Sequence, residues 1–205
     1  MSWKSSEIRE KYGYGYEIDV RIKPLSQEIQ EEFLENNNLE KNLLINSENI
    51  GHILDSLGKS YFKNELKEGR LGKRIVKAIN LNKRVNIGVI LNWIHFIENS
   101  IKFIQKGKNY FEEIILAEHI ENNFLFKMKK GNNTKSIGFF FGLFEENKEE
   151  CHVAEYSIQQ TSLEQIFNKF AFNQGKINNE IEEENILKES KNIVINDELY
   201  NNILS

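Results

Sequence analysis

The most reactive side chains in this sequence are adjacent, as Cys151 and His152. An imidazole beside a thiol favours the thiolate, which is the form of cysteine that attacks substrates. The sequence around the pair predicts a strand from residue 151 to residue 158, and adjacent residues of a strand point to opposite faces of a sheet. We therefore expect no nucleophilic site at this pair.

The histidines do not indicate a metal site. Zinc sites use closely spaced ligands such as H-x-x-x-H or C-x-x-C, and neither spacing occurs here. Glu118 and His119 have the types of an acid and a base, but side chains at i and i+1 do not face a common substrate. The sequence thus predicts neither a metal ion nor a catalytic pair. The four histidines are His52, His95, His119 and His152.

Two glycine-containing segments fall short of phosphate-binding loops. The segment Gly69 to Arg74, GRLGKR, has two residues between its glycines where the ATP-binding loop has four, and Arg74 replaces the required hydroxyl. The segment from Gly13 to Gly15 precedes a predicted strand, whereas the dinucleotide fingerprint follows one, and Ile18 replaces its third glycine. We expect no ATP hydrolysis, no cofactor and no enzymatic activity.

One segment of this acidic chain is strongly basic. Between residues 59 and 84 there are nine basic residues against Glu65 and Glu68, a net charge of +7 in a chain of net charge −4. Lys73, Arg74 and Lys77 are candidates for contact with anionic lipid headgroups or an acidic partner, although a solvated helix face is the alternative. Nucleic acid is not expected, because the nearby aromatic residues lie at one end of the charges.

The C-terminal half contains a strand followed by a capped helix. Residues 154–171 read AEYSIQQTSLEQIFNKFA, in which Tyr156 belongs to the strand. Thr161 and Glu164 have the spacing of a capping box, which marks a helix start. The apolar residues that follow recur at helical spacing, so one stripe of this helix is expected to pack on a core. They are Leu163, Ile166, Phe167, Phe170 and Ala171.

This segment resembles the end of the cytosolic C-terminal regulatory domain of A-subfamily ABC transporters, which are lipid exporters. The family pattern is S-x-x-Q-T-[ST]-L-[DE]-Q-[VI]-F-x-x-F-A after a strand that contains tyrosine. Residues 7–22, EIREKYGYGYEIDVRI, resemble the entry to the same domain through Gly13, Gly15 and Tyr16. The matching residues of the later segment are Ser157, Gln160, Thr161, Ser162, Leu163, Glu164, Gln165, Ile166, Phe167, Phe170 and Ala171.

The resemblance implies a non-catalytic regulatory domain that lacks the nucleotide-binding and transmembrane domains of the parent transporter. Such a domain would dock on a nucleotide-binding domain or on the companion regulatory domain. A free-standing soluble adaptor, or a module that binds anionic lipid, is the alternative. The resemblance covers residues 7–23 and about 110–171, so it says nothing about the residues between these segments.

The order of predicted elements is strand, helix, two strands, helix, strand, helix. This order is typical of an α+β fold with a ferredoxin-like split β-α-β sheet and helices on one face. We expect residues 1–172 to form one domain, with a mainly helical insertion at about 24–108. Residues 173–205 are expected to form an acidic, partly mobile tail.

The sequence also predicts a location. It contains one cysteine, so no disulfide can form within the chain, and a reducing compartment is expected. No run of about 20 apolar residues is present, and the N-terminus lacks the apolar stretch of a secretory signal. We expect a cytosolic domain, placed at the cytoplasmic face of a membrane by a parent transporter or a partner.

Overall fold

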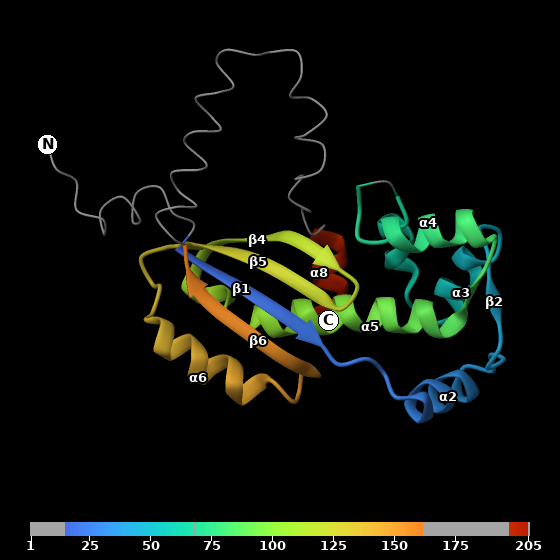
Figure 1. Ribbon diagram of the computed structural model, residues 1–205, viewed down its shortest axis with the longest axis horizontal. Coiled ribbons are helices and arrows are strands. Elements are labelled where there is room, and N and C mark those ends of the chain that lie inside the picture. Colours follow the sequence, from blue (N-terminus) through green and yellow to red (C-terminus); the bar gives the residue numbers. More distant parts are fainter. Residues whose placement is uncertain (1–14, 68, 162–196, 205) are drawn as a thin grey trace, which may run out of the picture.

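A computed structural model of the protein describes residues 15–67, 69–161 and 197–204. Its centre is a four-stranded antiparallel sheet with the strand order β4-β5-β1-β6 (Figure 1). The strands are β1 (Gly15–Ile22), β4 (Phe111–Ile120), β5 (Asn123–Lys130) and β6 (Val153–Gln160). Helix α5 (Ile87–Gln105) precedes β4, and α6 (Ile137–Asn147) connects β5 to β6. This order confirms the predicted α+β, ferredoxin-like split sheet.

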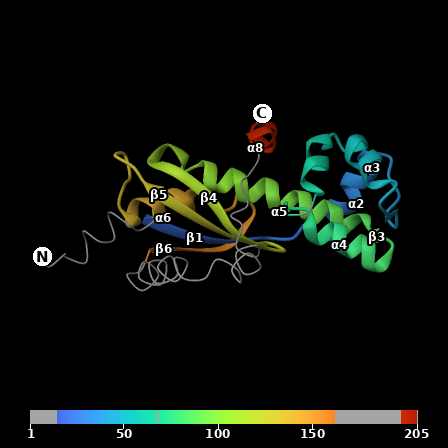
Figure 2. The ribbon, with the colours of Figure 1, turned by 90° about the horizontal axis from the view of Figure 1, so that it is seen from above.

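Both crossover helices, α5 and α6, lie on the same side of the sheet (Figure 2). Apolar and polar residues alternate along β1 from Tyr16 to Ile22, and the strand directs the apolar ones towards these helices. Tyr16, for example, is buried with its ring centre 5.5 Å from that of Phe140 on α6. Asp19 and Arg21 are exposed on the opposite face.

The chain between β1 and α5 forms a mostly helical unit beside the sheet (Figure 1). It contains α2 (Gln27–Asn36), β2 (Leu44–Ile45), α3 (Ile50–Ser56), the 3-10 helix η1 (Ser60–Glu65), α4 (Lys73–Asn82) and β3 (Val85–Asn86). Helices η1 and α4 are separate, because the chain turns between Glu65 and Lys73. At this turn the Gly72 N–H donates to Glu65 O at 2.8 Å, and a Cβ at Gly72 would lie 2.6 Å from that oxygen.

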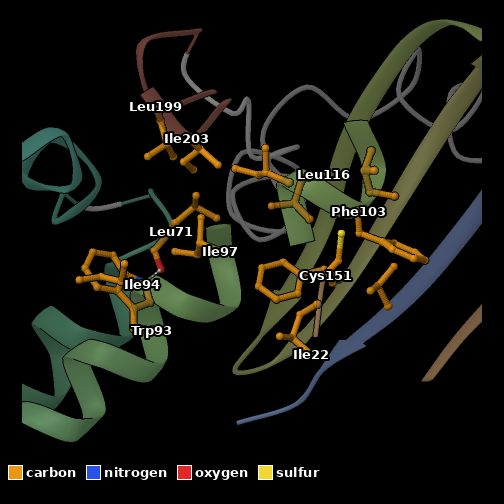
Figure 3. Packing of buried hydrophobic residues seen from close by; sticks show 14 of the residues in the cluster. Ile22, Leu71, Trp93, Ile94, Ile97, Phe103, Leu116, Cys151, Leu199 and Ile203 are labelled. Carbon is orange, nitrogen blue, oxygen red and sulfur yellow. Dashed lines mark hydrogen bonds between the residues drawn. The ribbon is translucent and has the colours of Figure 1, made fainter. Parts of the chain in front are cut away.

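One hydrophobic core joins the sheet to the helical unit. Trp93 of α5 is buried and donates through Nε1 to Leu71 O at 3.2 Å (Figure 3). Its ring centre lies 5.1 Å from that of Phe62, so this tryptophan is a core residue. Helix α8 (Asp197–Leu204) packs on α5 and η1 and buries Leu199 and Ile203 (Figure 3).

Helix α8 lies within residues 173–205, the segment for which the sequence predicts an acidic, partly mobile tail. Residues 173–196, which include most of the predicted acidic tail, lie outside the described part of the protein. Among the helices that are described, none combines the length and apolar character needed to cross a bilayer.

Candidate functional site

The two segments that carry the family resemblance meet at one end of the sheet. Strand β1 begins with Gly15 and Tyr16, and β6 ends at Gln160, next to Thr161. Tyr16 pairs with Gln160 in the register of β1 and β6, and the Thr161 N–H donates to Gly15 O at 3.2 Å. We refer to these four residues as the motif junction.

Within the motif junction, the structure explains why residue 15 is glycine and residue 16 is tyrosine. Gly15 has a φ of +102°, which lies in the left-handed region that favours glycine. The Tyr16 ring packs on Phe140, and its hydroxyl donates to Lys135 O at 3.2 Å. The Thr161 hydroxyl is buried and has no hydrogen-bond partner among the described residues.

The remaining predicted motif residues divide into two groups. Tyr156 lies half-buried on β6, where its hydroxyl donates to Phe141 O at 3.0 Å. Burial, together with the nearby Glu145 carboxylate, raises the pKa of Tyr156 to about 12. The other group lies outside the described residues, so the predicted C-terminal helix stays a prediction. It comprises Gly13, Leu163, Glu164, Ile166, Phe167 and Phe170.

The predicted basic contact residues line a groove between α4 and the end of β4, with a volume of about 800 Å³. Lys73, Lys77 and Leu81 recur every four residues on α4 and therefore share one side of the helix. The opposite wall is β4 from Ala117 to Ile120, at the outer edge of the sheet. We refer to this feature as the basic groove. Its lining residues are Gly69, Arg70, Leu71, Lys73, Arg74, Lys77, Ala78, Leu81, Asn82, Ala117, Glu118, His119 and Ile120.

The positive charge of the basic groove is only partly neutralised. Arg74 Nη1 lies 3.8 Å from Glu121 Oε1, which is a weak, exposed ion pair. Lys73 and Lys77 are exposed and form no ion pair with any residue that the structure describes. In contrast, Lys59 and Lys63 of the same basic segment are paired with Glu98 and Asp55. The groove therefore presents free ammonium groups to an anionic ligand.

His119 also lines the basic groove. It was not identified from the sequence as a residue of this site. Its Nε2 lies 2.8 Å from Glu121 O, and its ring stacks on Phe124 with centres 4.5 Å apart. Burial lowers the pKa of His119, and the charge of Arg74 lowers it further. The neutral imidazole thus adds polar surface to the groove without adding charge.

The Cys151 and His152 pair has a different setting from the one predicted. Both residues lie in the turn before β6, which starts at Val153, so the strand argument does not apply to them. Cys151 is buried, and this burial raises the pKa of its thiol. His152 is exposed and faces the ring of His95 at 5.0 Å. The thiolate form of Cys151 is therefore disfavoured because the side chain is buried, and not because of strand geometry.

Comparison of the chain with protein-family models, with curated proteins and with solved structures finds no match. Over the described part of the chain, no three His, Cys, Asp or Glu residues are grouped so that they could hold a metal ion. The motif junction and the basic groove are therefore the features on which a functional argument can be built.

Proposed function

We propose that this protein is a non-catalytic regulatory domain, similar to that of A-subfamily ABC transporters. It would dock on a nucleotide-binding domain or on a companion regulatory domain. The observation that supports the proposal is the motif junction, where segments resembling the family's entry and end pair in adjacent strands. A ferredoxin-like sheet is also the type of compact α/β domain that the resemblance implies.

Docking of this kind regulates a transporter only through a difference in affinity. A domain that binds one conformation of the nucleotide-binding domain more tightly than another shifts the population towards that conformation. No chemistry by the docked domain is required. The proposal therefore predicts that the effect on the partner depends on the nucleotide state of the partner.

The test is titration calorimetry of the full chain against purified nucleotide-binding domains of an A-subfamily transporter from the same cells. We expect binding with different dissociation constants for the ATP-bound and nucleotide-free forms, and a changed rate of ATP hydrolysis by the partner. The double variant K83E/R84E is the control, since it changes charge outside both the motif junction and the basic groove. Absence of binding in both nucleotide states would contradict the proposal.

A second function, binding of anionic lipid by an independent module, is favoured by the basic groove. Free ammonium groups at Lys73 and Lys77 lie next to apolar side chains, of which Leu81 is 72% exposed. A basic residue close to an anionic membrane contributes about 1 kcal/mol to binding. Cationic and apolar groups side by side match the two parts of a lipid at a membrane surface.

Vesicle co-sedimentation tests this second function. The protein is mixed with phosphatidylcholine vesicles that contain or lack phosphatidylserine. We expect binding only with phosphatidylserine, and a loss of at least about tenfold in K73E/K77E. The matched control is K83E/R84E, which makes the same change of charge in the same basic segment outside the groove lining. Equal loss in both variants would show that the groove is not the site.

A further inference from the structure

Helix α6 has an exposed apolar face. It lies at the end of the molecule opposite α2, α3 and α4 (Figure 1). Phe140 and Phe144 are fully buried towards the sheet, whereas Phe139 and Phe141 are 39% and 43% exposed. Phe139 and Phe141 are about 200° apart on the helix, so they border the exposed face of α6 on its two sides.

The middle of this exposed face is formed by two glycines, Gly138 and Gly142. A Cβ at Gly142 would meet no atom within 4 Å, and one at Gly138 would meet only Ser136 Oγ at 4.0 Å. The packing of the chain itself therefore does not require glycine at either position, although glycine weakens a helix interior. Small residues one turn apart allow a second helix to approach closely.

Opposite charges lie at the two ends of α6. Lys135 precedes the N-cap Ser136 at one end of α6, and Glu146 lies in the last turn at the other end. Both are exposed, and neither is ion-paired within the described ranges. A second α6 in antiparallel orientation would place Lys135 of each copy against Glu146 of the other.

The pattern is also symmetric along the helix. Phe140 is the midpoint between Gly138 and Gly142 and between Phe139 and Phe141. The midpoint between Lys135 and Glu146 lies half a residue beyond Phe140. A two-fold axis at Phe140 would therefore bring glycine to glycine, phenylalanine to phenylalanine and lysine to glutamate. This self-complementarity is what an isologous interface requires.

We propose that two copies of this protein associate through antiparallel contact of their α6 helices about a two-fold axis at Phe140. The inference goes beyond the proposed docking on a transporter and does not depend on it. A contact made mainly by one helix per copy buries less than the roughly 1,200 Å² of a stable interface. The expected dimer is therefore weak, with a dissociation constant on the order of micromolar.

Sedimentation velocity of the full chain over a series of concentrations tests the proposal. We expect a reversible monomer–dimer equilibrium. In G138A/G142A the added methyl groups should raise the melting temperature, because the helix is strengthened, and should weaken the dimer at least about tenfold. A weaker dimer with a raised melting temperature would show that the variant is folded and has lost only the contact between copies.

Charge reversal provides the decisive comparison. K135E and E146K should each weaken the dimer several-fold, since each places like charges in contact. The double variant K135E/E146K should restore the affinity of the original chain, because the pair is re-formed with its signs exchanged. A chain that stays monomeric at every concentration would overturn the proposal. So would a double variant that is no tighter than the single ones.

Discussion

Gly15 lies so close to Lys130 that a Cβ atom at residue 15 would stand 2.6 Å from the Lys130 Cγ. The same Cβ would be 3.0 Å from Met128 O. The left-handed φ of Gly15 adds a second reason for glycine at the start of β1. The close pairing of β1 and β5, and with it the motif junction, therefore depends on this residue.

G15A is expected to lower the free energy of unfolding by about 2 to 4 kcal/mol. About 1 to 2 kcal/mol comes from a side chain in the left-handed region, and the rest from the steric contact. Urea unfolding followed by circular dichroism measures the change. The control is G58A, because Gly58 also has a positive φ, +67°, but its Cβ would meet no atom within 4 Å. Equal losses in the two variants would show that the contact with Lys130 contributes nothing.

Features that follow from local sequence could be predicted before the structure. Ser26 and Ser136 are of a residue type that favours the N-cap of a helix, and each Oγ accepts from a backbone N–H three residues on, at 3.3 Å. The alternation of apolar and polar residues along β1 likewise indicates its buried face. These features depend on residues close in the chain, where spacing determines which side chains share a face.

The basic groove could be predicted only in part. Helical spacing places Lys73 and Lys77 on one side of α4, but nothing in the sequence indicates that this side faces β4 and His119. That placement depends on the turn between Glu65 and Gly72, which is stabilised by packing and a backbone hydrogen bond rather than by a periodic pattern. Packing between distant segments is the part of a fold that local patterns do not encode.

Stability is expected to fall in mildly acidic solution because of His95. Its Nε2 lies 3.1 Å from Lys23 O and its Nδ1 lies 3.0 Å from Asn99 Nδ2. The neutral Nε2–H tautomer satisfies both contacts, whereas a proton on Nδ1 would face the Asn99 amide donor. Burial lowers the pKa of His95, and the charge of His152 lowers it further.

Because the folded-state pKa of His95 is depressed, the unfolded chain binds the proton more readily. The stabilisation is fully present above about pH 6.5, the ordinary histidine pKa, and is lost as the pH falls below it. Chemical denaturation between pH 7.5 and about 5 measures the effect. H95Q should reduce the slope, with H52Q as an exposed control. An unchanged slope in H95Q would assign the pH dependence to other groups, of which His119 is the first candidate.

Glu65 is expected to destabilise the protein at neutral pH. The side chain is fully buried, and its carboxylate oxygens have no hydrogen-bond partner among the described residues. Burial raises the pKa of the Glu65 carboxyl, against the opposing charge of Arg70. A folded-state pKa above the unfolded value means that stability decreases as the pH rises through this range.

E65Q should therefore increase the free energy of unfolding at pH 7 by about 1 to 2 kcal/mol, since it removes a buried charge whose desolvation outweighs its attraction to Arg70. The gain should shrink towards pH 4, where the original carboxyl is protonated. Thermal unfolding at both pH values provides the comparison. A less stable E65Q at pH 7 would mean that attraction to Arg70 outweighs the cost of burial.

Trp93 is expected to stabilise the turn at one end of the basic groove, because its Nε1–H donates to Leu71 O in the turn that leads into α4. W93F removes this donor and part of the ring, so the Leu71 carbonyl loses its partner. The free energy of unfolding should fall by about 2 to 4 kcal/mol, from the unpaired carbonyl and the cavity together. Amide hydrogen exchange should rise at residues 69–74. The control is V89A, on the exposed side of α5. Equal amide exchange at residues 69–74 in W93F and V89A would show that Trp93 does not stabilise the turn.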